Sequence, residues 1–368
     1  MHPFHPFMLR AIALSRQGYG HTAPNPCVGA LLVKDGLVLA EGWHKAFGGA
    51  HAEVAALQDA ARKGVNPAEC SLVVTLEPCS HYGKTPPCTK AILDAGIRHV
   101  VVGVLDHNPL AAGGARVLSE QGVLVECGIA EQECRDNIAD FLIWQTSSRP
   151  YVILKLASTL DGRIATRNGH SKWISCAETL TRVHELRSQV QAVMVGGNTF
   201  YADNPALTCR LEHSSTPACI TPLAVIVTRR LPDNPTSFRL LQDRPQDVIF
   251  LTDTAQSESA AAKKLQDLGV SIWGTAGDYL AEGITRLRRE RQVHYLLCEG
   301  GGRLGLALLK NKLADELRLH LSPKIIGDAE ARPLFDGLQP ETMTEALGLR
   351  FIGSEFCGED LLLQLRRC

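Results

Sequence analysis

The stretch EPCSHYGKTPPC, residues 77–88, follows an apolar run that we expect to be a buried strand. Its last cysteine opens a segment with helical spacing, and the sequence HAE at residues 51–53 opens another expected helix. His51, Cys79 and Cys88 therefore stand where regular elements begin or end, so a folded domain can bring them together. The pattern predicts a metal site on an α/β framework.

The residue types in this pattern indicate zinc chemistry. One imidazole and two thiolates make a tetrahedral zinc site whose fourth position is free for water. Zinc lowers the pKa of that water, and Glu53, which is not a ligand, could carry protons from it to a leaving amine. The H-x-E plus P-C-x-x-C signature of zinc deaminases matches, except that eight residues separate the two cysteines. A structural zinc knuckle is the alternative; it needs a fourth protein ligand, for which His44 and His81 are the nearest candidates.

Strand and helix signals alternate along the chain, which predicts an α/β fold in both halves. In the first half we expect helices over residues 8–17, 51–63, 89–95, 115–121 and 130–145, and strands over residues 28–33, 37–40, 71–76, 99–105 and 123–127. In the second half we expect strands over residues 151–157, 192–196, 223–227, 248–251, 270–273, 294–298, 317–321 and 361–365, and helices over residues 177–189 and 257–268.

A polar segment divides the chain. The sequence TSSRP, residues 146–150, ends in a proline and separates an expected helix from an expected strand, as a linker between domains should. A length of 368 residues also favours two domains. We therefore place a first domain over residues 1–147 and a second over residues 150–368.

Composition excludes several classes of protein. Lys and Arg number 38 against 39 Asp and Glu, so no excess of positive charge is available to bind a polyanion, and we expect no nucleic-acid partner. No apolar run approaches the ~20 residues that span a bilayer, so we expect no membrane partner. The first residues lack the pattern of a secretory signal, which predicts a cytoplasmic protein whose twelve cysteines are reduced thiols or metal ligands rather than a disulfide framework.

Residues 77–88, with PNPCVG at residues 24–29 and HAE at residues 51–53, resemble the bifunctional riboflavin-biosynthesis deaminase-reductases, whose first half belongs to the cytidine deaminase superfamily. The long loop between the two cysteines is a feature of that branch. The resemblance implies a cytidine-deaminase-like three-layer domain. It also implies Zn2+ on His51, Cys79 and Cys88, Glu53 as the proton shuttle, and substrate contacts from Asn25, His81 and Lys84, of which Lys84 suits a phosphate.

A glycine-rich turn is the main chemical signal of the second half. The sequence GGGRLG, residues 300–305, follows an expected strand, opens a helix and satisfies G-x-G-x-x-G, so its backbone N–H groups could receive a phosphate or pyrophosphate. Glu330, the acid nearest the expected distance, does not follow an obvious second strand of a βαβ unit, which disfavours a Rossmann domain. A turn that needs glycine only for packing is the alternative.

Three further stretches resemble the reductase half of the same family: LK at residues 154–155 with STLDGR at 158–163, SKWIS at 171–175, and ADNPALT at 202–208. The fold of that half is similar to dihydrofolate reductase. The resemblance implies NADPH bound near Ser158, Trp173, Thr199, Asp203, Gly301, Gly302, Arg303, Leu304 and Gly305, and a phosphoribosyl substrate held by Ser171, Arg187, Leu207, Arg210 and Glu299. Guanidinium forks pair well with phosphate oxygens, which suits the two arginines.

The sequence departs from the family pattern at several positions. His107 replaces a proline, Gly114 stands in a segment that lacks the arginine of a Gly-Arg-Gly sequence, and Ala224 and Thr228 replace a common arginine and aspartate. The first two put some deaminase-site geometry in question, and the last two concern the cofactor edge.

We expect zinc-dependent hydrolytic deamination of a diaminohydroxyphosphoribosylaminopyrimidine, followed by NADPH-dependent reduction of its ribosyl side chain to ribityl. One alternative is an active deaminase with an impaired or altered reductase half. A nucleic-acid-editing deaminase would need a basic groove and stacking aromatics, neither of which is apparent. A third alternative is a zinc-stabilised interaction module without catalysis. The expected partner is the small-molecule substrate, and we expect a homo-oligomer, either a dimer or a tetramer.

Overall fold

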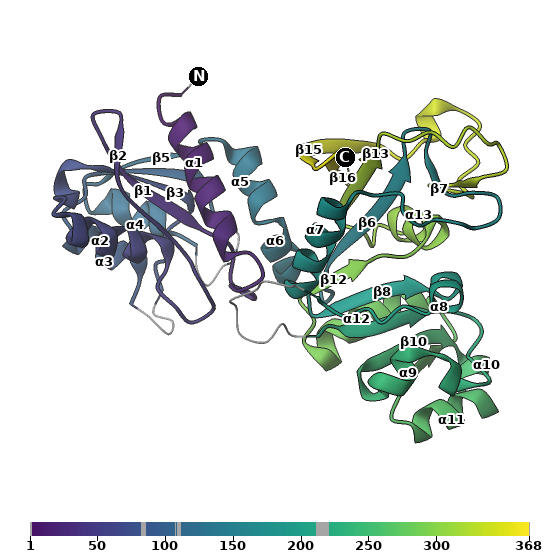
Figure 1. The fold of residues 1–368 in the computed structure, drawn as a ribbon. Helices are drawn as coiled ribbons and strands as arrows, with labels where there is room; N and C mark the ends of the chain where they lie inside the picture. The colour runs from purple at the N-terminus through teal and green to yellow at the C-terminus, as the bar shows by residue number, and fades with distance from the viewer. Residues whose placement is uncertain (1, 82–85, 107, 109–111, 211–220, 368) are drawn as a thin grey trace. The chain divides into compact units, whose positions relative to one another are not determined.

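A computed structural model describes residues 2–81, 86–106, 108, 112–210 and 221–367 (Figure 1). The chain divides into two compact units, a first unit over Met1–Ser147 and a second unit over Ser148–Cys368. Across the described ranges, no helix is both long and apolar enough to cross a membrane.

The first unit is built on a five-stranded mixed sheet with strand order β2-β1-β3-β4-β5. Strands β1, β2 and β3 are antiparallel neighbours, whereas β3, β4 and β5 run parallel. Its strands are β1 (Gly29–Lys34), β2 (Leu37–Trp43), β3 (Ser71–Leu76), β4 (His99–Val104) and β5 (Leu124–Cys127). Its helices are α1 (His5–Ser15), α2 (Ala52–Lys63), α3 (Cys88–Asp94), α4 (Gly114–Glu120), α5 (Glu131–Asn137) and α6 (Ala139–Thr146).

Helices cover both faces of this sheet, which makes three layers. On one face, alternate strand residues pack against an alanine-rich face of α2 and against α3 and α4: Ala30, Leu32, Leu72, Val74, Val100 and Val102 meet Ala52, Ala56, Ala60, Ile92 and Leu118. Helix α1 contacts β1 and β3, and α5 contacts β4 and α1. Because successive strand residues point to opposite faces, the continuous apolar strands fit a sheet buried on both sides.

The second unit holds a nine-stranded sheet with order β11-β10-β9-β8-β12-β6-β13-β16-β15. Strands β11 through β13 of this order are parallel, and β16 and β15 add an antiparallel hairpin. The strands are β6 (Tyr151–Thr159), β7 (Arg163–Ala165), β8 (Ala192–Gly196), β9 (Leu223–Val227), β10 (Val248–Asp253), β11 (Ser271–Thr275), β12 (Tyr295–Cys298), β13 (Glu316–Ser322), β14 (Arg332–Pro333), β15 (Leu349–Cys357) and β16 (Asp360–Arg367). The helices are α7 (Ala177–Ser188), α8 (Gly197–Asp203), α9 (Arg239–Asp243), α10 (Thr254–Ser257), α11 (Ala260–Asp267), α12 (Tyr279–Arg291) and α13 (Gly302–Lys310).

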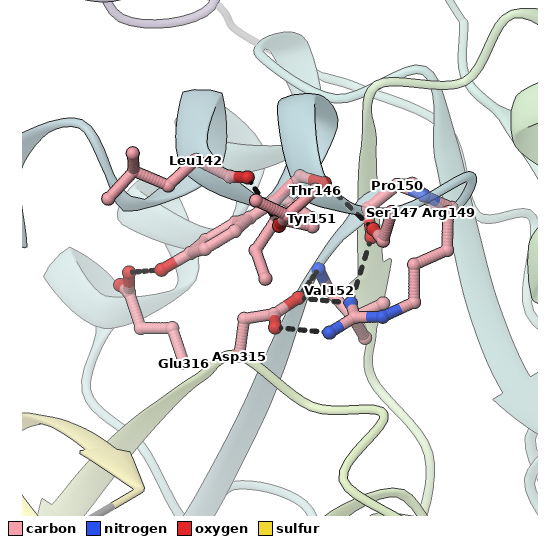
Figure 2. A network of polar contacts seen from close by, with 10 residues as sticks. Leu142, Thr146, Ser147, Arg149, Pro150, Tyr151, Val152, Asp315 and Glu316 are labelled. Carbon is pink, nitrogen blue, oxygen red and sulfur yellow. Dashed lines mark hydrogen bonds and ion pairs between the residues drawn. The ribbon is translucent and has the colours of Figure 1, made fainter. Parts of the chain in front are cut away.

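The start of the second unit is fixed by a polar network (Figure 2). Arg149 donates two hydrogen bonds to the Asp315 carboxylate, at 2.6 and 2.7 Å, and the same carboxylate accepts from the Val152 N–H at 2.8 Å. The Tyr151 hydroxyl donates to Glu316 at 2.9 Å. Because charge-assisted bonds of this kind are strong when shielded from water, the network anchors β6 beside β13.

Three details differ from the sequence expectations. The helix expected over residues 130–145 is divided into α5 and α6 at Ile138, whose dihedral angles of −110° and 21° leave the helical region while its β-branched side chain is buried. Strand β15 was not predicted, because its mixture of polar and apolar residues lacks a clear alternation. Cys209 is disulfide-bonded, so the expectation of reduced thiols is wrong at that position, although nine described cysteines are free.

Candidate active sites

The three predicted zinc ligands come together in the first unit. His51 is the N-cap residue of α2, Cys79 follows β3, and Cys88 is the first residue of α3. The Nδ1 atom of His51 lies 3.6 Å from the Cys79 Sγ and 3.2 Å from the Cys88 Sγ, and all three ligand atoms lie within 4.8 Å of one another. This spacing suits a single tetrahedral metal ion. Among the described residues, neither His44 nor His81 joins this cluster, which leaves a coordination position open.

The local environment prepares these groups for their chemistry. Hydrogen bonds from the Cys88 thiol, from His51 and from the Cys88 N–H hold the pKa of Cys79 below its usual value, although burial opposes them. Glu53 lies in the first turn of α2 and is 3% exposed. Burial raises the pKa of the Glu53 carboxyl, because the charged form loses its hydration. A carboxyl with a raised pKa can hold and release a proton near neutral pH.

These groups face a cavity of about 350 Å³ that lies wholly within the first unit. Its lining includes His51, Glu53, Cys79 and the predicted substrate contacts Asn25 and His81. Phe47, Asp106, Asn108 and Phe141 also line it. Lys84 and the departure at His107 lie outside the described residues.

His44 is a lining residue whose place in the site the sequence did not indicate. Its Nδ1 lies 2.9 Å from the Ala50 carbonyl oxygen, and its Nε2 lies 3.3 Å from the Asn25 amide nitrogen. Burial lowers the pKa of His44, which favours the neutral ring. Since a carbonyl oxygen only accepts, Nδ1 carries the proton and Nε2 accepts from Asn25. His44 therefore fixes the orientation of Asn25 at the cavity wall, through a contact that no sequence spacing marks.

A buried carboxylate shapes the opposite wall. Glu77, 6% exposed, accepts hydrogen bonds from the N–H groups of Asp106, Gly113 and Ala115 at 3.0, 3.1 and 2.9 Å. A Cβ atom at Gly114 would lie 1.8 Å from the Pro78 carbonyl oxygen. The absence of an arginine at this position thus accompanies a backbone approach that only glycine permits. Glu77 and Gly114 together fix the segment that leads from β3 to Cys79.

In the second unit, the predicted residues gather where parallel strands end. Ser158 lies near the end of β6 and Glu299 directly after β12, while Thr199 and Asp203 lie on α8, which follows β8. Because β8, β12 and β6 are adjacent and parallel, their carboxyl ends meet at one edge of the sheet. Ligands of open parallel sheets bind at such an edge. The exposed Trp173 and the half-buried Ser171 lie in the segment between β7 and α7.

Arg187 and Glu299 form a nearly buried ion pair, with side chains 13% and 14% exposed. Arg187 donates to both carboxylate oxygens, at 2.7 and 2.8 Å, and also to the Thr208 carbonyl oxygen at 3.0 Å. Burial alone would raise the pKa of Glu299, but these bonds hold it below its usual value. Arg187 is therefore already engaged, whereas Arg210 is exposed and its guanidinium makes no ion pair with any described residue.

The glycine-rich turn has two kinds of glycine. A Cβ atom at Gly302, the first residue of α13, would lie 2.0 Å from the Leu334 carbonyl oxygen, so packing requires glycine there. A Cβ atom at Gly301 would meet nothing within 4 Å, and the φ of Gly301 is −68°. The protein itself does not require glycine at Gly301, which is the situation expected where a ligand approaches the backbone. Ser158 fits a bound group too, because its buried Oγ makes no hydrogen bond with the described residues.

Family models match both halves of the chain. The model described as the cytidine and deoxycytidylate deaminase zinc-binding region matches residues 2–104, and the RibD C-terminal domain model matches residues 150–363. Riboflavin biosynthesis protein RibD of Aquifex aeolicus is 38% identical over 98% of this chain and 98% of its own length.

Solved structures agree with these matches. A diaminohydroxyphosphoribosylaminopyrimidine deaminase/5-amino-6-(5-phosphoribosylamino)uracil reductase from Thermotoga maritima is 37% identical, with a TM-score of 0.78 over 100% of this chain and 99% of its own. Acinetobacter baumannii RibD is 33% identical, with a TM-score of 0.76 over 100% and 99% of the two chains. These matches confirm the resemblance found in the motifs, and they give no support to an impaired reductase half. The chain belongs to the RibD family of riboflavin biosynthesis, bifunctional enzymes with a zinc-dependent deaminase domain and an NADPH-dependent reductase domain.

Proposed function

We propose that residues 1–147 deaminate a diaminohydroxyphosphoribosylaminopyrimidine and that residues 150–368 reduce 5-amino-6-(5-phosphoribosylamino)uracil. The observation that carries the first assignment is the cluster of His51, Cys79 and Cys88 within 4.8 Å, facing a cavity that also contains Glu53. A site with three protein ligands and a nearby carboxyl group is the arrangement of a hydrolytic zinc enzyme.

In the deaminase site each residue has a distinct task. Zinc on His51, Cys79 and Cys88 supplies a Lewis acid that lowers the pKa of water. The Glu53 carboxyl takes up a proton and delivers it to the leaving amine, a task for which its burial and raised pKa are suited. Asn25, held by His44, binds the polar edge of the pyrimidine. His81 and Lys84 remain the predicted contacts of the phosphoribosyl end.

In the reductase site the chain orients two ligands. NADPH supplies the hydride, and the substrate must present its sugar in the open form, so that a trigonal carbon can accept it. The proposed cofactor contacts are Ser158, Trp173, Thr199, Asp203, Gly301, Gly302, Arg303, Leu304 and Gly305. The proposed substrate contacts are Ser171, Arg187, Leu207, Arg210 and Glu299. Because Arg187 is paired with Glu299, we assign the substrate phosphate to Arg210.

We also propose that the enzyme is a homo-oligomer in the cytoplasm. Phe351 and Phe356, which are 68% and 79% exposed, lie on β15, the last strand of the nine-stranded sheet. An edge strand with exposed aromatic side chains supports coverage by a second copy.

A coupled assay tests the proposed function. Zinc-loaded protein receives the diaminopyrimidine substrate while ammonia release is followed, and NADPH is then added while its absorbance is recorded. We expect Glu53→Gln to lower ammonia release by about 10³-fold, because no carboxyl remains to carry the proton. Zinc content and NADPH oxidation with the deaminated substrate should not change.

Glu120→Gln is the matched control, since Glu120 is an exposed residue of the same unit that pairs with Arg116. It should behave as the parent enzyme. Unchanged ammonia release in Glu53→Gln would remove the proposed deaminase mechanism.

A further inference from the structure

The loop formed by residues 206–210 carries two of the proposed reductase substrate contacts but lies outside any helix or strand. Leu207, 3% exposed, has a φ of +48°, a region that side chains other than glycine rarely adopt. A strained backbone of this kind persists only where the surrounding structure holds it. The groups that hold this loop therefore control where its substrate contacts lie.

Arg244, the residue that ends α9, reaches this loop from below. It is 8% exposed, and one of its terminal nitrogens donates to the carbonyl oxygens of Ala206 and Leu207, both at 3.0 Å. The other terminal nitrogen donates to the Pro222 carbonyl oxygen at 2.6 Å. A single buried guanidinium thus binds three backbone carbonyls, two of them at the strained position.

The charge of Arg244 has little carboxylate compensation. The nearest carboxylate oxygen, on Asp247, lies 4.0 Å away, and the Arg244 Nε is buried without a partner in the described residues. Burial lowers the pKa of Arg244, and the positive charge of Arg187 acts in the same direction, so the two guanidinium groups sense one another. A buried charge is retained at such a cost only if its hydrogen bonds do useful work elsewhere.

Other side chains hold the loop on its second side. Arg187 donates to the Thr208 carbonyl oxygen at 3.0 Å, and the Arg210 N–H donates to the His184 Nδ1 at 3.2 Å. Arg187 also binds Glu299. The loop backbone is therefore fixed between Arg244 on one side and the proposed substrate-binding groups on the other.

We propose that Arg244 is a positioning residue of the reductase site, which holds the Ala206 and Leu207 carbonyls so that Leu207 and Arg210 face the phosphoribosyl substrate. It acts through the loop and does not touch the substrate. This inference rests on the proposed reductase function.

The test compares Arg244→Met, Arg244→Lys and the parent enzyme, with reductant present so that the Cys209 disulfide does not hold the loop. For Arg244→Met we expect the KM for 5-amino-6-(5-phosphoribosylamino)uracil to rise about tenfold or more, because charge-assisted hydrogen bonds to the loop are lost. The kcat should change by less than about threefold, and the Kd for NADPH, measured by fluorescence, should not change. Arg244→Lys keeps the charge but not the fork, and its KM should rise less.

Arg239→Met is the matched control, because Arg239 is an exposed arginine of the same helix whose side chain makes no ion pair or hydrogen bond with the described residues. Its kinetics should equal those of the parent enzyme. If Arg244→Met does not fold, as judged by NADPH binding, Arg244→Lys carries the test. An unchanged KM in the folded variants would overturn the inference, as would a parallel loss of kcat and NADPH affinity. A parent enzyme that does not reduce the substrate would instead overturn the proposed function.

Discussion

The first unit places its proposed catalytic groups at the ends of regular elements, whereas the second unit places many of its proposed ligand contacts on connecting segments. His51, Cys79 and Cys88 lie at the start of α2, after β3 and at the start of α3. Leu207 and Arg210 lie in a loop that side chains hold in place. A metal ion needs a few ligands at fixed distances, and these can come from short motifs. Two extended ligands need many contacts, which come from distant parts of the chain.

The two units nevertheless share one device, with opposite charge. In the first unit the buried Glu77 carboxylate accepts from three backbone N–H groups. In the second unit the buried Arg244 guanidinium donates to three backbone carbonyls. In both, a charged side chain takes the place of a neighbouring strand in satisfying loop backbone groups. The loops can therefore be irregular and still be held in one position.

The largest expected effect breaks the comparison at the metal. In Cys88→Ser the hydroxyl is a poor zinc ligand, so zinc content and ammonia release should both fall to the detection limit. NADPH oxidation with the deaminated substrate should remain at the parent level, because the second unit uses no zinc. Metal analysis and the two assays check this. A chelator should reproduce the effect, and added zinc should reverse it.

Cys127→Ser is the matched control, since Cys127 is an exposed free thiol of the same unit. It should keep zinc and both activities. Zinc retained in Cys88→Ser would show that the cluster does not hold the ion.

A smaller effect separates two glycines. Gly114→Ala places a Cβ atom 1.8 Å from the Pro78 carbonyl oxygen, so the segment before Cys79 must shift. We expect unfolding of the first unit to become about 1–3 kcal/mol easier, and ammonia release to fall by about 10–100-fold. Gly301→Ala meets nothing within 4 Å, so its melting temperature should not change while its affinity for NADPH decreases.

Calorimetry and NADPH titration measure both variants. A destabilised Gly301→Ala with normal NADPH affinity would mean that the glycine-rich turn serves packing alone. A Gly114→Ala variant with parent stability and ammonia release would show that Pro78 yields without affecting the site.

The sequence predicted the features that local chemistry marks. The zinc cluster could be predicted because its residue types, at the ends of expected elements, have few other uses together. His44 and Arg244 could not, because their partners are backbone carbonyls and an amide that are far away in sequence. The break at Ile138 was missed for a related reason, since only tertiary packing makes the helix end there. Residues that act on the backbone of distant loops leave no spacing signal.

The last prediction compares stability against pH in the second unit, where the 6% exposed Glu316 accepts from Tyr151 and pairs with Arg318 and Arg366. Burial alone would raise its pKa, but the two arginine charges and the hydrogen bonds lower the pKa of Glu316 from 4.5 to about 2. A carboxyl with a lowered folded-state pKa contributes stability that is fully present above its unfolded pKa and is lost as the pH falls toward the folded value. The unfolding free energy of the second unit should therefore fall by roughly 3 kcal/mol from this group between pH 5 and pH 2. Glu316→Gln has no such proton to bind, so the difference in unfolding free energy between parent and variant should shrink over that interval, as followed in the transition that NADPH raises. Because Glu316 lies outside the proposed sites, reductase kinetics at neutral pH should change less than in the other variants; a constant difference across the interval would show that the arginines do not hold the Glu316 charge.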